Sequence, residues 1–411
     1  MSALYLYDDA RARTFEPFAL TRPVSELMAG AMIIRERWEL ATGMAAAGFI
    51  GASHLAQFDE MSAPRAVPVD GEIAAGSVIA SSRFVTALGT DLADATAEPD
   101  APLAYYSAEQ ICAVRLSAAM RASDFADGKL DLESLAPKSR GGRRRLTGHW
   151  LENVWDPIDQ LPAQLTADIR ELASKLTLST SGNATVLGSH GVYCEAGAHI
   201  EPFVVLDAVA GPILICKGAT ISSFTRIVGP CYIGENTIVV GDAIRSCSIG
   251  ETCKVRGEIS NSIMLGHSNK GHTGFVGHSY LGRWVNLGAV TTTSNLKNTY
   301  GNVQMWTPEG MRDTRSQFLG TLFGDHVKTG IGTMLTTGTV LGAGANVYGG
   351  HVGSKFVPPF AWGDGEPYGT FDLDKFIEVA ERMMARRHVE LSESGKRHLA
   401  AAFYKSRGST E

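Results

Sequence analysis

Three histidines lie within twelve residues of the segment HSNKGHTGFVGHSYLGRWVNLGAVTTTSN, which spans residues 267–295. One chemistry open to this segment is general-base catalysis, because a neutral imidazole can take a proton from an attacking amine or hydroxyl. The other is zinc binding, because the imidazoles of His267, His272 and His278 are ordinary zinc ligands. The residues alone leave both chemistries open.

A six-residue repeat surrounds this segment and must position it. From about residue 190, branched residues recur in steps of six between small and Gly-rich positions. The positions in phase are Ile215, Ile221, Ile227, Ile233, Val239, Ile249, Val255, Phe275, Leu281, Leu287, Phe323, Thr329, Leu335, Leu341 and Val347. This period fits a triangular solenoid in which each short parallel strand points one side chain inward. We therefore expect a left-handed parallel β-helix, since the strands of a sandwich would recur every 8 to 12 residues or so without a common phase.

The repeat divides the chain into four expected parts. Residues 1–155 mix short β-like and helical runs without hexads, which predicts an α/β domain. Residues 156–180 have helical spacing and predict a linker helix. Residues 181–363 form the expected β-helix, and residues 364–411 form a short helical tail.

Two segments depart from the hexad pattern. The polar and aromatic stretch between Thr291 and Gly320 must leave the solenoid as a loop, because no coil interior could accept it. In the tail, one helical face is expected to carry Phe376, Val379, Ala380 and Met383, and a second helix is expected from about Ser392 to Tyr404.

Composition narrows the class of protein. The 411 residues are 44% hydrophobic and carry a net charge of -6, which favours small-molecule partners over nucleic acid or anionic membrane. The start, MSALYLYDDARAR, lacks the basic and apolar regions of a signal peptide, so we expect a cytoplasmic protein without membrane contact. The six cysteines form no CxxC pair, which predicts buried, reduced thiols.

The segment NKGHTGFVGHSYLGRWVNLGAVTTTSN resembles the acetyltransferase site of the bifunctional N-acetylglucosamine-1-phosphate uridyltransferase/glucosamine-1-phosphate acetyltransferases. In that family a Lys-x-Gly-His run precedes an Asn before Gly-Ala and a second Asn that opens a loop. The stretches PFALTRP, NKGH and FVPPFAWG are also similar to a divergent bacterial subgroup of sugar nucleotidyltransferases. The resemblance implies a homotrimer, with acetyl-CoA bound between neighbouring solenoids and an amino-sugar phosphate whose amine attacks the thioester directly.

The same resemblance implies the roles of individual residues. His272 matches the general base, and Asn295 matches a residue near the reacting amine and acetyl group. Asn286 matches a contact to the sugar phosphate, whereas Phe275 replaces a Tyr that would supply a phosphate-directed hydroxyl. The remaining expected substrate-binding residues are Arg256, Arg245, Lys297 and Lys270.

The amino-terminal stretch YDDARARTFEPFALTRPVSEL resembles the Gly-rich phosphate loop of sugar nucleotidyltransferases. Arg13, Thr21 and Arg22 keep part of that pattern and are the expected nucleotide contacts. Asp8 and Asp9 replace glycines, and the strand VIASSRF lacks the metal-binding Asp of the family. If this domain is active, the resemblance implies UTP or dTTP as substrate and Mg²⁺ held by Asp8 and Asp9. The alternative is a degenerate nucleotide-binding domain.

Together these features predict a transferase of the nucleotide-sugar (UDP-N-acetylglucosamine-type) pathway that acetylates an amino-sugar phosphate in the β-helix, with or without nucleotidyl transfer in the first half. Two other hypotheses stay open. A γ-carbonic-anhydrase-like zinc β-helix would use the His-x₄-His pair His267 and His272. A non-catalytic assembly protein would use the solenoid only to form trimers.

Overall fold

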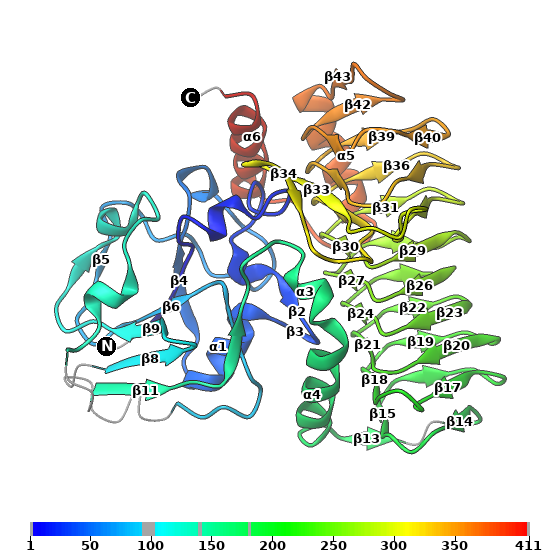
Figure 1. The fold of residues 1–411 in the computed structure, drawn as a ribbon, viewed down its shortest axis with the longest axis horizontal. Helices are drawn as coiled ribbons and strands as arrows, with labels where there is room; N and C mark the ends of the chain where they lie inside the picture. The colour runs from blue at the N-terminus through cyan, green and yellow to red at the C-terminus, as the bar shows by residue number, and fades with distance from the viewer. Residues whose placement is uncertain (1–2, 93–102, 139–141, 180–181, 409–411) are drawn as a thin grey trace. The chain divides into compact units, whose positions relative to one another are not determined.

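The computed structural model describes residues 3–92, 103–138, 142–179 and 182–408, and contacts divide the chain into two compact units. The first unit joins Met1–Val154 to Ser392–Glu411, and the second is Trp155–Leu391. In Figure 1 the first unit runs from blue to cyan and ends in red, and the second runs from green to orange.

The first unit is built on a mixed sheet with the strand order β11-β8-β9-β6-β1-β4. Its strands are β1 (Leu4–Tyr7), β4 (Ala46–Ile50), β6 (Val78–Ser81), β8 (Leu103–Ser107), β9 (Gln110–Arg115) and β11 (Arg143–Arg145). β1 runs parallel to both of its neighbours, so the carboxyl ends of β1, β4 and β6 meet at one edge of the sheet. Helix α1 (Ile34–Thr42) is anchored by Trp38, whose indole N–H donates to the carbonyl of Ser81 over 3.2 Å. The expected α/β domain is confirmed.

The second unit is a parallel β-solenoid of three faces, with one strand per face in each coil. Face 1 consists of β15 (Val192–Glu195), β18 (Ile213–Ile215), β21 (Cys231–Ile233), β24 (Ser248–Ile249), β27 (Ile263–Met264), β30 (Tyr280–Leu281), β35 (Thr321–Phe323), β38 (Thr339–Leu341) and β41 (Phe356–Val357), with β13 (Leu178–Ser179) pairing antiparallel at its start. Face 2 consists of β16 (His199–Ile200), β19 (Thr220–Ile221), β22 (Ile238–Val239), β25 (Lys254–Val255), β28 (Asn269–Lys270), β31 (Asn286–Leu287), β36 (Lys328–Thr329), β39 (Asn346–Val347) and β42 (Ala361–Gly363), and β43 (Gly369–Thr370) closes its end. Face 3 consists of β14 (Thr185–Leu187), β17 (Val205–Asp207), β20 (Thr225–Val228), β23 (Asp242–Arg245), β26 (Glu258–Ser260) and β29 (Phe275–Gly277), followed by β32 (Thr292–Thr293), β37 (Met334–Leu335) and β40 (His351–Val352).

The interior of the solenoid confirms most of the hexad positions. One apolar cluster runs from Cys194 to Ala361 and includes Ile215, Val255 and Leu287. The expectation at Phe275 is wrong by one residue, because the buried side chain there is that of Val276. The interior residues Val276 and Leu281 are five positions apart rather than six, so the corner between them is one residue shorter than the repeat predicts.

One interior position holds a lysine. Val255 of β25 pairs with Lys270 of β28, so Lys270 occupies the next rung of the interior column and is 1% exposed. A charged side chain is tolerated at such a place only where hydrogen-bond acceptors surround it. Backbone carbonyls at the corner after β28 are those acceptors.

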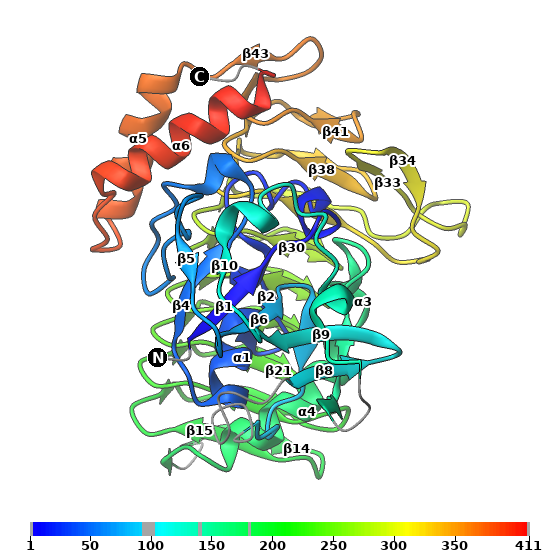
Figure 2. The same cartoon turned by 90° about the vertical axis from the view of Figure 1, so that its left-hand side faces the viewer.

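The break in the repeat confirms the expected loop. It carries a β-hairpin of β33 (Gln304–Thr307) and β34 (Gly310–Asp313), which Figure 2 shows projecting beside the stacked strands. The ring of Trp306 stacks on Phe356, with centroids 3.6 Å apart and 13° between the ring planes. That contact fixes the hairpin against face 1.

Helices flank both units. The linker region contains α3 (Asp156–Asp159) and α4 (Leu161–Ala173), and α4 buries Leu161, Leu165 and Ile169 in the second unit. Helix α5 (Leu373–Ala385) also belongs to the second unit and packs Phe376 against Phe360, with ring centroids 5.0 Å apart.

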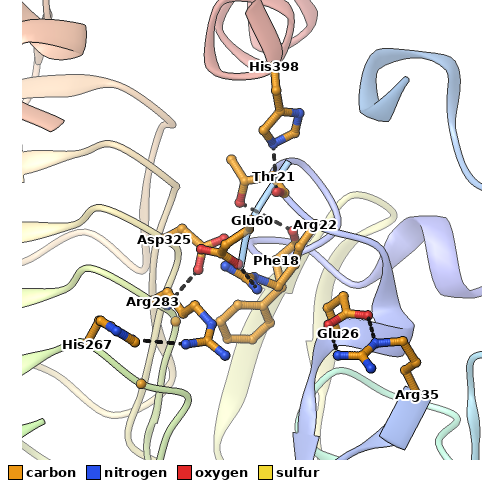
Figure 3. Close-up of polar contacts among 12 residues, drawn as sticks. Phe18, Thr21, Arg22, Glu26, Arg35, Glu60, His267, Arg283, Asp325 and His398 are labelled. Carbon is orange, nitrogen blue, oxygen red and sulfur yellow. Dashed lines mark hydrogen bonds and ion pairs between the residues drawn. The ribbon is translucent and has the colours of Figure 1, made fainter. Parts of the chain in front are cut away.

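The last helix, α6 (Glu393–Ser406), belongs to the first unit. Its N-cap Ser392 accepts a hydrogen bond from the amide of Gly395 over 3.0 Å, and His398 Nε2 lies 2.8 Å from the carbonyl oxygen of Thr21 (Figure 3). A second helix from about Ser392 is therefore confirmed.

All six cysteines are buried and unpaired, as expected from their spacing. Burial raises the pKa of the Cys247 and Cys253 thiols to about 12, so both are protonated at neutral pH. Within the described ranges, the helices are too short or too polar to span a lipid bilayer.

Candidate active site

A groove of about 640 Å³ runs along face 2 of the solenoid and is walled on its other side by α5. Face 2 contributes one outward side chain per coil, and the parallel register places these side chains in a column. The column consists of Ile238, Lys254, Asn269, Asn286 and Lys328. The helix contributes Val379, Arg382, Met383, Arg386 and Arg387. The volume lies within the usual range for small-molecule sites.

The centre of the column is a ladder of two asparagines. Asn269 Nδ2 donates to Asn286 Oδ1 over 2.7 Å, which leaves the amide group of Asn286 available to the groove. Lys254 lies one rung before this pair, and Lys328 lies one rung after it. Lys328 Nζ donates to the carbonyl of His326 over 3.1 Å, and burial lowers the pKa of Lys328 to about 8.

His272 lies at the rim of this groove, at the corner between faces 2 and 3. Its side chain is exposed and makes no hydrogen bond or ion pair with any residue in the described part of the chain. A free imidazole at a groove can act as a base toward a bound ligand. Of the expected site residues, the structure brings His272 and Asn286 together here.

Lys270 lies under this corner rather than in the groove. Its Nζ donates to the carbonyl oxygens of Arg256, His272 and Thr273, so the ammonium is satisfied by backbone acceptors. Burial lowers the pKa of Lys270 to about 8. Direct contact between the Lys270 ammonium and a substrate does not fit this position, because the ammonium already donates to the backbone carbonyls around His272.

Asn295 lies at a different corner, between faces 3 and 1. Its Nδ2 is 2.9 Å from His278 Nδ1, and Asn261 Nδ2 is 2.9 Å from His278 Nε2. The His278 ring also stacks on Phe318, and burial lowers the pKa of His278 to about 4. The structure therefore places Asn295 with His278 and not with His272.

The other expected substrate contacts also lie outside the groove. Arg256 is exposed and pairs with Asp242 over 3.3 Å, and Arg245 is exposed at the end of β23. Lys297 Nζ donates to the carbonyl of Asn302 within the loop. Their assignment to substrate remains a prediction from the resemblance.

The histidines do not form a zinc site in this structure. His267 Nδ1 lies 3.1 Å from a guanidinium nitrogen of Arg283 (Figure 3), and His278 is held between two asparagines. Across the described residues, no group of three or more His, Cys, Asp or Glu side chains is placed to hold a metal ion. The carbonic-anhydrase hypothesis does not fit this geometry.

The first unit has its own pocket, of about 710 Å³, at the carboxyl ends of β1 and β6. Arg83 crosses it: Nη2 is 2.7 Å from Asp9 Oδ2, and the guanidinium carbon lies 5.2 Å from the centre of the Trp150 ring. The charged lining residues are Arg11, Arg83, Lys129 and Arg143 against Asp9, Glu109, Asp131 and Glu133. Among the residues that the structure describes, four cations face four carboxylates, so the described lining carries no excess positive charge for a triphosphate.

The expected nucleotide contacts do not line this pocket. The Arg13 guanidinium donates to the backbone carbonyls of Asp8, Phe125 and Ala126, which makes it part of the unit's internal structure. Arg22 Nη1 pairs with Glu60 over 2.8 Å (Figure 3), and Thr21 accepts from His398 through its carbonyl. The basic stretch 138–146 contributes Arg143 to the pocket, while its residues 139–141 lie outside the described part.

Asp8 and Asp9 do not fit a Mg²⁺ site. Asp8 is 3% exposed and accepts hydrogen bonds from Ser82 Oγ and from the amide of Val24, and burial raises the pKa of its carboxyl group to about 6. Asp9 is held by Arg83 through both carboxylate oxygens. A hard cation needs several oxygen ligands free of such partners. Arg83 thus supplies the positive charge at the place where a metal was expected.

The cations of the groove were not among the residues predicted from the sequence; they are Lys254, Lys328, Arg382, Arg386 and Arg387. The cationic face of the helix was detectable in the sequence, because Arg382 and Arg386 are four residues apart and so lie on the same helical face. The expected apolar face was slightly rotated: the buried residues of α5 are Phe376, Ala380 and Met384, and Val379 and Met383 face the groove.

Comparison with known proteins supports the predicted resemblance to sugar nucleotidyltransferases. Residues 4–177 match the family model described as sugar nucleotidyl transferase. The chain is 31% identical to the bifunctional sugar-1-phosphate nucleotidylyltransferase/acetyltransferase of Sulfurisphaera tokodaii over 161 residues, which are 36% of this chain and 38% of that protein. The predicted resemblance is therefore confirmed.

Further relatives carry the name bifunctional protein GlmU. The protein from Methanococcus vannielii is 26% identical over 52% of this chain and 50% of its own length, and that from Synechococcus is 22% identical over 53% and 42%. The chain thus spans half or less of the length of these relatives. Their activities, substrates and partners enter below as proposals.

Proposed function

We propose that the second unit transfers an acetyl group from acetyl-CoA to the amine of a phosphorylated amino sugar, with His272 as general base. The observation that carries this proposal is the free imidazole of His272 at the rim of a groove whose described lining includes five cations and no carboxylate. Both the expected acyl donor and the expected acceptor carry phosphate, so a groove of this charge suits either of them.

The proposed reaction is a direct attack. The acceptor nitrogen forms a bond to the thioester carbonyl carbon while His272 takes the proton that the nitrogen loses. The carbon–sulfur bond then breaks, and the coenzyme A sulfur takes the proton that His272 had accepted and leaves as the thiol. Asn286 and Asn269 offer amide groups to the sugar, and Lys270 fixes the backbone on which His272 stands.

In the first unit we propose binding without metal-dependent nucleotidyl transfer. The ion pair between Asp9 and Arg83 supports this choice, because it occupies the carboxylate that Mg²⁺ would need. A nucleotidyltransferase acting on UTP or dTTP is the second candidate, and the family match of residues 4–177 favours it. A homotrimer with acetyl-CoA between neighbouring copies stays a prediction of the resemblance.

One incubation tests these proposals. The purified protein is mixed with acetyl-CoA, glucosamine 1-phosphate, UTP and Mg²⁺, and free thiol and pyrophosphate are followed separately. We expect thiol release without pyrophosphate. Pyrophosphate release that depends on both UTP and Mg²⁺ would establish the second candidate instead.

The role of His272 is tested by His272→Ala, with His199→Ala as the matched control. His199 is an exposed histidine of the same face and lies outside the groove. We expect the first variant to lower kcat by about 10² to 10⁴, which is roughly 3 to 5 kcal/mol of barrier, and the second to leave it unchanged. Turnover of the His272→Ala variant at the wild-type rate contradicts the assignment.

A further inference from the structure

The groove carries more positive charge than proton transfer by His272 requires. Side chains of Lys254, Arg386 and Arg387 make no hydrogen bond or ion pair with any residue that the structure describes. Arg382 pairs with the exposed Glu378 over 2.9 Å, and neither Glu378 nor any other carboxylate in the described part of the chain lines the groove. Unpaired cations that converge on one cavity repel each other, so an anion in the cavity would stabilise them.

The helix dipole explains only part of this arrangement. Arg386 and Arg387 follow the last turn of α5, where the partial negative charge of the helix terminus favours cations. Lys254 and Lys328 stand on the opposite wall and belong to β-strands, which have no such dipole. Two unrelated elements thus direct cations into the same space.

The spacing of the cations indicates the size of the anion. Lys254 and Lys328 are three rungs apart on face 2, which is about 14 Å along the column. Arg382 and Arg386 are one turn apart on α5, or about 6 Å. A single phosphate group is too small to contact both ends of such a column. The asparagine ladder between the lysines offers neutral hydrogen-bonding groups, as the sugar portion of a nucleotide or a hexose would need.

We propose that Arg386 and Arg387 at the carboxyl end of α5, together with Lys254 and Lys328 of face 2, bind the phosphate groups of a ligand that carries two or more of them. Two sources share this chemistry: the adenosine 3′,5′-bisphosphate portion of coenzyme A and a nucleoside diphosphate attached to the acceptor sugar. The proposal deepens the proposed function and rests on it for the reaction, while binding is measured independently of turnover. Helix α5 is then part of the ligand-binding wall of the solenoid.

The test is titration calorimetry on the full chain with coenzyme A, adenosine 3′,5′-bisphosphate, UDP, glucosamine 1-phosphate and inorganic phosphate. The variants are Arg386→Glu/Arg387→Glu on the helix and Lys254→Glu on the sheet. Lys375→Glu is the control, because Lys375 is exposed on the same helix and does not line the groove. Circular dichroism and the melting temperature verify folding, and the Gln double variant replaces the Glu double variant if the latter does not fold.

We expect a ligand with several phosphates to bind more tightly than inorganic phosphate or glucosamine 1-phosphate. Its affinity should fall by about tenfold or more in the double variant and in Lys254→Glu, but change less than about twofold in Lys375→Glu. A loss confined to coenzyme A and the bisphosphate identifies the acyl donor, and a loss confined to UDP identifies the acceptor. Equal affinity of the double variant and the wild type for every probe overturns the proposal, as does the absence of binding to the wild-type protein.

The two proposals fail in different ways. Binding that depends on Arg386 and Arg387 without any thiol release refutes acetyl transfer and leaves the phosphate site standing. Thiol release with wild-type binding in the double variant refutes the phosphate site and leaves acetyl transfer standing. Where both hold, the double variant raises the KM of the phosphorylated substrate and leaves kcat at saturation nearly unchanged.

Discussion

Replacing Lys270 by Met should loosen the corner that carries His272 without disturbing the rest of the solenoid. The Lys270 ammonium donates to the carbonyls of Arg256, His272 and Thr273. Three such bonds at about 1.5 kcal/mol each contribute roughly 4 to 5 kcal/mol. Burial lowers the pKa of Lys270 from 10.5 to about 8, which corresponds to roughly 3 kcal/mol of unfavourable charge burial that methionine relieves. The net loss is then about 1 to 2 kcal/mol.

Hydrogen exchange at Val290 measures this loss directly. The Val290 amide donates to the Thr273 carbonyl over 3.0 Å and so reports whether the corner is closed. A loss of about 1 to 2 kcal/mol accelerates its exchange roughly five- to thirtyfold. Lys217→Met is the control, because Lys217 is an exposed lysine that pairs with Glu235 elsewhere in the solenoid.

Turnover gives the second readout of the same variant. Since the backbone of His272 would no longer be fixed, kcat should fall by about one order of magnitude while the KM for acetyl-CoA stays within about twofold. Unchanged exchange at Val290 together with unchanged kcat would refute the reasoning. A fall in kcat without faster exchange would mean that Lys270 acts on the substrate after all.

Three further perturbations follow from contacts described above. Burial lowers the pKa of His278 to about 4, whereas the pKa of a histidine in the unfolded chain is near 6.5. The stability that neutral His278 contributes is therefore present above about pH 6.5 and is lost as the pH falls toward 4. Urea unfolding of the second unit should show a loss of roughly 3 kcal/mol over this interval that His278→Gln abolishes. Arg83→Gln removes the cation that pairs with Asp9 and leaves that carboxylate with the amide of Ala12, so it should destabilise the first unit by about 2 to 4 kcal/mol, measured by thermal unfolding. Trp306→Ala removes the stack on Phe356 and should weaken the packing of the hairpin against face 1 by about 1 to 2 kcal/mol. The measurement is faster proteolysis of residues 294–320.

Each of these has a matched control or a contrary result. His199→Gln should keep the wild-type pH dependence, and a His278→Gln variant that also keeps it disproves the titration argument. Lys129→Gln should leave thermal unfolding unchanged, because the ion pair of Lys129 with Asp127 is exposed on both sides. A hairpin that resists protease equally with and without Trp306 shows that other contacts hold it.

The hexad pattern predicted the solenoid because a strand with one inward side chain per coil leaves a direct trace in the sequence. Ile215, Val255 and Leu287 occupy the interior as their spacing indicated. The pattern could not predict Lys270 inside, since a buried ammonium depends on three carbonyls that only the folded corner brings together. Val276 rather than Phe275 lies in the interior for a related reason. The corner that follows is one residue shorter than the hexad predicts, and the composition does not indicate this.

The candidate site was predictable only in part. His272 and Asn286 were found because both lie in one motif and on neighbouring coils. The cations were not, because Lys254, Lys328 and Arg386 come from distant parts of the chain and meet only when α5 lies along face 2. The charge balance of the first-unit pocket likewise depends on where side chains point, which residue types alone do not encode.

Asn286 and Lys328 are adjacent rungs of face 2 although 42 positions separate them in the sequence, since the excursion with its hairpin leaves and re-enters the stack between them. The distance between binding side chains is therefore set by the separation of adjacent strands on face 2. It does not depend on the number of residues inserted between two coils. Ligand reach along this face can change only in whole-coil increments of about 4.8 Å. A foreign domain inserted at the hairpin tip should therefore leave the distance between Asn286 and Lys328 unchanged. One coil added or deleted between these two residues should change that distance and favour a longer or shorter ligand.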